Sequence, residues 1–202
     1  MELLVVRHAQ PERARPENGP ADPALTDLGS RQADALGQWL TRTPEARPDR
    51  IIASTMRRAR QTAEAIAERT GLQVETDERI AEFDLGAREY IPIEQLGASV
   101  LEAATSALQT GVWGSHTFDP DAFRARVRAG FNDIVADANA ERVVVVCHGG
   151  VLNSWLSGVI GRPHGIFFMP HYTSVSRVLV GPDRSLRLGS LNELPQGDAL
   201  VQ

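Results

Sequence analysis

Two histidines in this chain stand in sequence contexts that suit phosphoryl transfer. His8 directly follows Arg7, and His148 is followed by Gly149 and Gly150. An imidazole can attack phosphorus, and guanidinium groups pair with phosphate oxygens in a two-pronged geometry. Because phosphoryl transfer depends mainly on positioning and charge stabilisation, these residue types predict a site for a phosphate monoester.

Each candidate residue has a role in such a reaction. Arg7, Arg58 and a protonated His148 could stabilise the phosphate without a metal ion. His8 would attack phosphorus, while Glu82 would protonate the leaving oxygen and later deprotonate the attacking water. We therefore expect no metal, no cofactor and a bell-shaped dependence of the rate on pH.

Other reactive side chains are interpreted as structural. Cys147 belongs to an apolar run, and a thiol buried in a strand is usually inert. In the RRAR run only Arg58 is assigned to the site, and Arg57 is interpreted as a surface charge. A lone histidine is more often structural than catalytic. The histidines interpreted in this way are His116, His164 and His171.

The candidates follow predicted strands of one sheet. Residues 3–6 (LLVV) and 143–146 (VVVV) form short β-branched runs, typical of strands buried on both faces of a parallel sheet. Two more short strands are predicted at 50–53 and 72–75. The ligand crevice of an open α/β sheet lies at the carboxyl ends of its strands. Residues that directly follow these strands are therefore expected to converge.

Helical patterns separate the strands. Thr26 is a plausible N-cap for a helix over 25–41, and Gly71 a plausible C-cap for one over 56–70. Further helices are predicted at 121–138 and 150–160, and two final strands at 174–180 and 185–191, joined by a turn at Pro182 and Asp183.

This order of elements predicts an α/β fold. We expect a three-layer sandwich with a mostly parallel central sheet and helices on both faces. Residues 1–202 are expected to form a single domain. The section 84–120 is interrupted by glycines and prolines, so it is interpreted as a small insertion or lid.

Five segments resemble the histidine phosphatase superfamily, in particular its phosphoglycerate mutase-like family. The five segments are LLVVRHAQ, LTDLGSRQA, ASTMRRARQTAEAI, IAEFDLG and VVVVCHGGVL. They occur in the order and spacing of that family. The resemblance implies that His8 becomes a phosphohistidine and that Glu82 is the general acid and base. It further implies that Arg7, Arg58, His148 and Gly149 hold the phosphate.

Four positions depart from the family pattern. Ala9 replaces the glycine of the RHG signature, and Thr55 replaces the usual proline. Pro11 and Ala14 stand where mutase-like members carry a hydroxyl and an asparagine, so side-chain contacts to substrate are lost. We therefore expect a phosphatase, with a phosphoglycerate mutase-type transfer and a non-catalytic phosphate-ligand-binding module as alternatives.

Composition narrows the choice of partners. The chain has 202 residues, a formal net charge of -5 and one cysteine. A mildly acidic balance gives no general attraction to nucleic acid or membranes. No apolar run approaches the length of a spanning helix, and no signal peptide is recognised. We expect a cytoplasmic enzyme acting on a small phosphorylated metabolite, whose identity and oligomeric state the sequence leaves open.

Overall fold

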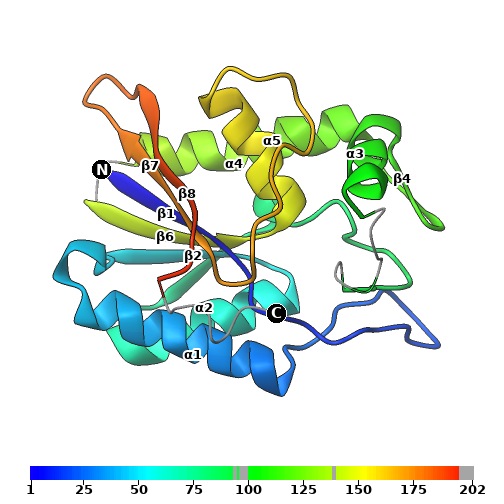
Figure 1. Cartoon of the computed structure of the whole chain (residues 1–202), viewed down its shortest axis with the longest axis horizontal. Helices are drawn as coiled ribbons and strands as arrows, with labels where there is room; N and C mark the ends of the chain where they lie inside the picture. The colour runs from blue at the N-terminus through cyan, green and yellow to red at the C-terminus, as the bar shows by residue number, and fades with distance from the viewer. Residues whose placement is uncertain (93–94, 96–99, 138–139, 196–202) are drawn as a thin grey trace.

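A six-stranded sheet forms the middle layer of the protein (Figure 1). The computed structural model describes residues 1–92, 95, 100–137 and 140–195. The strand order is β3-β2-β6-β1-β7-β8. Their bounds are Glu2–Arg7 for β1, Arg50–Ser54 for β2, Val74–Asp77 for β3, Arg142–Cys147 for β6, Val175–Val180 for β7 and Leu186–Glu193 for β8.

The sheet is mixed but mostly parallel, as expected. β1 pairs with β6, β6 with β2, and β2 with β3, all in parallel. β7 and β8 extend the sheet as an antiparallel hairpin beyond β1. The predicted turn at Pro182 and Asp183 joins these two strands.

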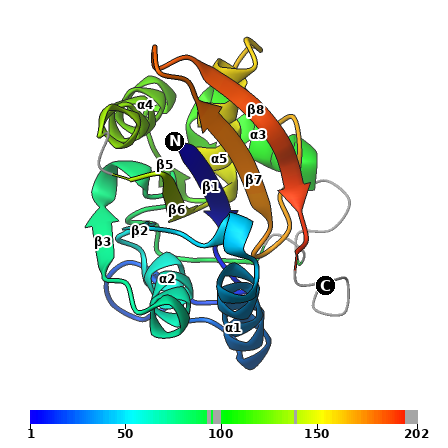
Figure 2. The ribbon, with the colours of Figure 1, turned by 90° about the vertical axis from the view of Figure 1, so that its left-hand side faces the viewer.

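Helices cover both faces of the sheet, which confirms the three-layer α/β fold (Figure 2). α1 (Asp27–Arg42) and α2 (Arg57–Thr70) lie on one side. α4 (Pro120–Ala136) and α5 (Gly149–Val159) lie on the other. The two-residue period of the strands therefore divides the core into two clusters. Leu4 and Val144 pack on the α1/α2 side, and Leu3 and Val143 on the α4/α5 side.

Both predicted helix caps are confirmed. The Thr26 hydroxyl accepts a hydrogen bond from the Gly29 amide at 2.8 Å. Gly71 ends α2 in the left-handed conformation, at a φ of 76° that glycine adopts readily.

Several boundaries differ from the expected ones by one or two residues. β3 begins at Val74 instead of residue 72, α1 begins at Asp27 instead of 25, and α4 ends at Ala136. The end predicted for that helix, residue 138, lies outside the described residues. Hydrophobic periodicity gives an element's centre better than its ends, where caps decide.

The section after Glu82 contains a helix and a small hairpin. α3 spans Val100–Thr110, and the two-residue strands β4 (Val112–Trp113) and β5 (His116–Thr117) pair in antiparallel fashion. The aromatic ring of Phe118 stacks on that of Phe83, with the ring centroids 5.0 Å apart. This contact packs the hairpin against the residue that follows Glu82. From the sequence, residues 84–120 are interpreted only as a small insertion or lid.

Candidate active site

His8 lies at the carboxyl end of β1, beside the carboxyl end of β6. Its backbone N–H donates to the carbonyl of Cys147 at 2.9 Å, which continues the β1–β6 register by one residue. The side chain is 3% exposed. Nδ1 lies 2.8 Å from the carbonyl oxygen of Ala9. Because a carbonyl can only accept, Nδ1 carries the proton and Nε2 presents a lone pair.

His148 follows β6 directly and faces His8. The two ring centroids are 5.0 Å apart, and the ring planes are tilted by 57°. Nε2 of His148 shares a hydrogen bond of 2.8 Å with the hydroxyl of Ser54, the last residue of β2. Three neighbouring parallel strands therefore position the two imidazoles, as the strand-end argument predicted.

Arg58 reaches the same place from the first turn of α2. Its Nε donates to Nε2 of His8 at 3.3 Å, and its Nη2 donates to both carboxylate oxygens of Asp84 at 2.9 and 3.2 Å. The side chain is 1% exposed, whereas the neighbouring Arg57 is exposed. This difference confirms that Arg58, and not Arg57, points into the protein.

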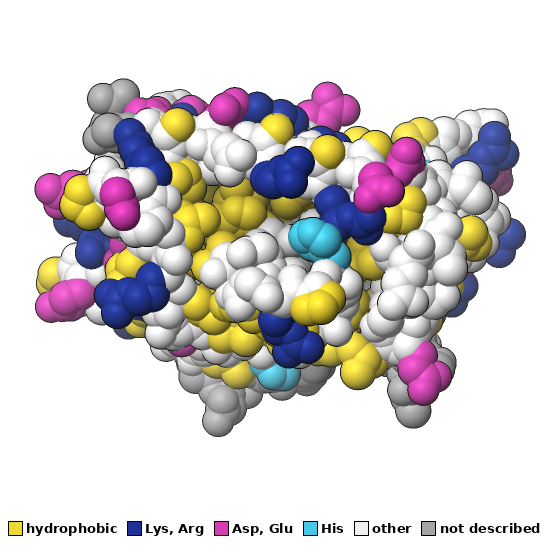
Figure 3. All heavy atoms as spheres, turned by 90° about the horizontal axis from the view of Figure 1, so that it is seen from above, with side chains coloured by type: hydrophobic (Ala, Val, Ile, Leu, Met, Phe, Trp, Pro, Cys, Tyr) yellow, Lys and Arg dark blue, Asp and Glu magenta, His cyan; other side chains and the backbone are white. Residues whose placement is uncertain are grey.

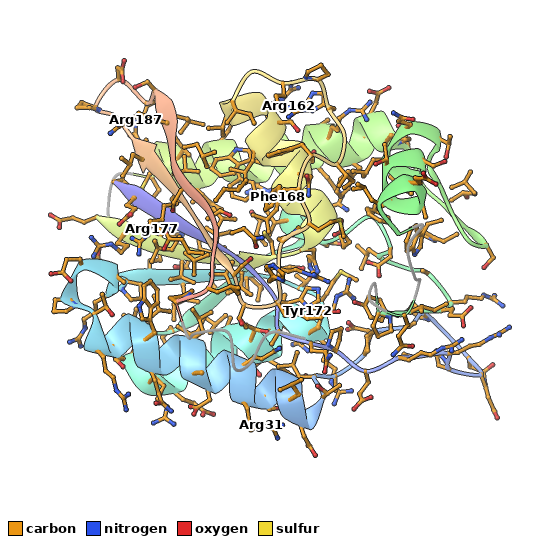
Figure 4. The ribbon with its side chains drawn as sticks, viewed as in Figure 1. Arg31, Arg162, Phe168, Tyr172, Arg177 and Arg187 are labelled. Carbon is orange, nitrogen blue, oxygen red and sulfur yellow. The ribbon has the colours of Figure 1, made fainter. Side chains whose placement is uncertain are left out.

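Arg7 is held by the loop that precedes β7. Its Nη1 donates to the carbonyl of Pro170 at 2.7 Å. Its guanidinium carbon lies 3.9 Å from the centre of the Tyr172 ring, a cation–π distance. Tyr172 lies near the carboxyl end of β1 in Figure 4.

Three buried nitrogens around His8 have no hydrogen-bond partner among the described residues. They are Nε of Arg7, Nη1 of Arg58 and Nδ1 of His148. Buried polar groups are almost always hydrogen-bonded, and an unsatisfied one costs about 1–3 kcal/mol. A tetrahedral oxyanion beside Nε2 of His8 offers acceptors for all three, so this donor set fits a phosphate group.

Glu82 contributes a carboxyl group to the same space. Its Oε2 accepts from the Gly150 amide at 2.7 Å, and its Oε1 accepts from the Phe83 amide at 3.0 Å. Arg126 of α4 donates to the carbonyl oxygens of Ala81 and Glu82, which fixes this turn. The site requires glycine at position 150, because a Cβ there would lie 2.4 Å from Oε1 of Glu82.

Burial shifts the pKa values of three titratable groups in the site. Burial and, after it, the charge of Asp84 raise the pKa of Glu82 to about 7. Burial and the charge of Arg58 lower the pKa of both His8 and His148 well below the usual histidine value. Both shifts favour the neutral imidazole; for His148 this differs from the protonated form expected from the sequence, and its protonation state in the reaction stays a prediction.

Five of the six predicted site residues meet at one pocket. Arg7, His8, Arg58, Glu82 and Gly149 line a cavity of about 70 Å³. That volume is a little over twice the ~30 Å³ share of one water molecule in the liquid. His148 is not among the residues that line this cavity, and its ring centroid lies 5.0 Å from that of His8.

Sequence analysis missed residues that support this pocket. Asp84 pairs with Arg58, and the only signal for it was an acidic residue two positions after Glu82. Tyr172 and Asn153 have no such signal, because their contacts depend on the loop before β7. Asn153 donates to the carbonyl of Phe168 at 3.0 Å and so anchors that loop on α5.

The part of the chain that the structure describes shows neither a metal-binding cluster nor a membrane-spanning helix. The described residues contain no group of three or more His, Cys, Asp or Glu side chains that could hold a metal ion. None of the helices in the described ranges has both the length and the apolar character needed to cross a bilayer. On the face shown in Figure 3, basic and acidic side chains are interspersed.

Comparison with known proteins relates this geometry to a family. The family model described as the histidine phosphatase superfamily (branch 1) matches residues 3–193. Two similar proteins are named "Probable phosphoglycerate mutase GpmB". The one from Yersinia enterocolitica is 30% identical over 168 residues, and the one from Proteus mirabilis is 32% identical over 177 residues. Both alignments cover 81% of this chain and 76% of the relative.

Solved structures with this fold include phosphatases. A mycobacterial glucosyl-3-phosphoglycerate phosphatase in complex with inorganic phosphate matches with a TM-score of 0.74 and 27% identity. That match covers 97% of this chain and 99% of the other. The α-ribazole phosphatase of Shigella flexneri matches with a TM-score of 0.70 over 96% of each chain. At 21% identity, this second likeness is one of fold alone.

Proposed function

The chain belongs to the histidine phosphatase superfamily, and from this premise we propose that it hydrolyses a phosphate monoester through a phosphohistidine on His8. The observation that carries the proposal is the set of three buried nitrogens beside His8 that have no hydrogen-bond partner in the described part of the chain. Arg7, Arg58 and His148 supply these nitrogens, all buried. They are arranged for the charge on phosphate oxygens, which is where phosphoryl transfer needs stabilisation.

In the first step the phosphoryl group moves from the substrate to His8. The lone pair on Nε2 forms the N–P bond as the ester P–O bond breaks. The leaving oxygen takes the proton held by Glu82, which is available because the pKa of this carboxyl is about 7.

In the second step water releases the phosphoryl group. Glu82, now a carboxylate, accepts a proton from the water as its oxygen bonds to phosphorus. The N–P bond breaks, its electron pair returns to Nε2, and inorganic phosphate is formed.

His148 serves as a neutral donor in this scheme. We assign the hydroxyl of Ser54 as the donor in its hydrogen bond with Nε2 of His148, so that the ring proton lies on Nδ1. Nδ1 then donates to a phosphate oxygen. The lowered pKa of His148 agrees with this role, since no proton beyond the neutral form is needed.

We favour hydrolysis over a mutase reaction. The backbones at Pro11 and Ala14 form bridges with Leu25 and Tyr90, and neither side chain can donate a hydrogen bond. A mutase must retain its phosphorylated form and keep water out. This loop offers no polar side chain at those positions to hold a second group of the substrate.

We also propose a domain organisation, a cofactor requirement and a substrate class for this protein. We propose a single domain over residues 1–202 with an insertion at about 84–120, turnover without a metal or cofactor, and an acid-type pH optimum. The substrate is proposed to be a small phosphorylated metabolite. A cytoplasmic location stays a prediction.

Release of inorganic phosphate from p-nitrophenyl phosphate tests the function. We expect hydrolysis in the presence of EDTA, unchanged by added bisphosphoglycerate and abolished by His8→Ala. A strict requirement for bisphosphoglycerate would instead identify a mutase. Phosphate binding without any turnover would identify the non-catalytic binding module.

A further inference from the structure

The pocket wall beyond the phosphate-binding groups is apolar. While Arg7, His8, Arg58 and Glu82 line its polar end, the rest of the wall comes from Phe83 and the loops and helices around it. The apolar members of this wall include Phe83, Ile91, Ala104, Trp113, Ile166 and Met169. Such a wall favours an apolar group on the substrate, because contact with it removes apolar surface from water.

Two polar side chains next to this wall are already engaged. Asn153 donates from Nδ2 to the carbonyls of Gly149 and Phe168, and its Oδ1 accepts from the amides of Phe167 and Phe168. Asp84 accepts two hydrogen bonds from Arg58. A polar substituent that lies against the apolar side chains would exchange its hydration for apolar contacts.

Cations for a second anionic group are missing from the pocket. All 21 basic residues of the chain are arginines, and every one lies in the described part. Among them, Arg7 and Arg58 alone line the pocket, and both belong to the phosphate end. The carboxylate of Asp84 lies in the same pocket and repels a second negative charge.

A neighbouring hollow contains both a basic and an acidic residue. It shares Ile91 and Trp113 with the pocket, so a longer substrate could extend between these two side chains. Its basic residue, Arg88, is accompanied by the acidic Glu89. Glu89 is itself paired with Arg13 at 3.0 Å.

We propose that the alcohol half of the substrate is an uncharged, apolar group, such as an aryl-alkyl or branched alkyl chain. Esters whose alcohol carries a carboxylate or a second phosphate are poor substrates. This inference rests on the proposed phosphatase function and specifies its substrate class. A second anion would have to shed water without gaining a partner, which is costly in an apolar site.

Three esters of primary alcohols provide the test, because their leaving groups have similar chemistry. We expect kcat/KM to be about ten-fold higher for phenethyl phosphate than for glycerol phosphate. We also expect kcat/KM for glycerol phosphate to exceed that for phosphoglycerate by at least about ten-fold. Phosphoglycerate turned over as efficiently as phenethyl phosphate would overturn the inference.

Variants of the wall identify the cause of the preference. Trp113→Ala is expected to lower kcat/KM for phenethyl phosphate about ten-fold while changing that for glycerol phosphate less than about two-fold. Trp39→Ala, on α1 and outside the pocket, is the matched control and should change neither. Equal losses for both esters in Trp113→Ala would contradict the inference. Ile166→Ala is a second wall variant, and inhibition by inorganic phosphate reports whether each variant retains its phosphate end.

An absence of phosphatase activity can be distinguished from an absence of the proposed substrate preference. If none of the three esters is hydrolysed, the phosphatase proposal is wrong. The preference is then measured as binding, by calorimetric titration of the His8→Ala protein with each ester. Tighter binding of phenethyl phosphate would still support the inference, and equal or tighter binding of phosphoglycerate would refute it.

Discussion

Nε of Arg58 lies 3.3 Å from Nε2 of His8, so one guanidinium contacts the nitrogen that the proposed mechanism uses as nucleophile. The positive charge also helps to keep that imidazole neutral by lowering its pKa. Asp84 holds the other end of the guanidinium through Nη2. Arg58 therefore connects the acidic side of the pocket to the nucleophile.

Replacing the guanidinium tests its geometry. Arg58→Lys keeps the charge but loses the fork that reaches both Asp84 and His8, so we expect kcat/KM to fall about 100-fold. Arg57→Lys, one residue earlier and exposed, is the matched control and should stay within about two-fold of wild type. Steady-state kinetics with p-nitrophenyl phosphate measure both. A fully active Arg58→Lys protein would exclude the proposed role of the fork.

The pH dependence follows from Glu82. Its carboxyl must be protonated in the first step, so kcat/KM should decline as pH rises through about 7. Asp84→Asn removes a negative charge that raises this pKa. The pKa of Glu82 then falls, and the decline should begin at lower pH than in wild type.

Asp77→Asn is the control for this shift. Asp77, the last residue of β3, also pairs with an arginine, Arg79, whose side chain is 42% exposed. Its pH profile should match that of wild type. An Asp84→Asn profile that coincides with the wild-type profile would show that Asp84 does not act on Glu82.

Removal of the general acid should depend on the leaving group. In Glu82→Gln we expect kcat/KM for an alkyl phosphate to fall about 10²- to 10⁴-fold, because an alkoxide needs a proton to leave. p-Nitrophenolate leaves without one, so p-nitrophenyl phosphate should lose much less in its first step. Equal losses for the two substrates would argue against Glu82 as the proton donor.

Space for the Glu82 carboxyl gives a steric test. Gly150→Ala would place a methyl group 2.4 Å from Oε1 of Glu82. Because the carboxyl must then move, we expect kcat/KM to fall at least about ten-fold. Gly158→Ala lies on the same helix with open space around its Cβ. It should retain activity and gain up to about 1 kcal/mol of helix stability. Kinetics and thermal unfolding of the pair distinguish site distortion from helix effects.

The ends of hydrophobic runs made most of the site predictable. Residues 3–6 and 143–146 have β-branched runs that end one residue before their strands end, so the positions of His8 and His148 follow from the parallel sheet. The family resemblance is confirmed by the family model over residues 3–193. The catalytic roles of the individual residues stay predictions.

Contacts made by loops could not be predicted in the same way. Tyr172 reaches Arg7 only because the loop before β7 folds back over β1, and no periodic pattern encodes that path. β4 and β5 have two residues each, which is too short to show an alternation. The lowered pKa of His148 depends on burial and on the charge of Arg58, and neither can be read from the sequence.

Detection of the phosphorylated intermediate tests the central claim most directly. The protein is mixed with excess p-nitrophenyl phosphate, quenched within milliseconds at alkaline pH and digested, and the peptide that contains His8 is analysed by mass spectrometry. We predict an acid-labile phosphoryl group on His8 in wild type and none in His8→Asn. Rapid turnover with phosphate on another residue, or hydrolysis by His8→Asn at the wild-type rate, would contradict the account.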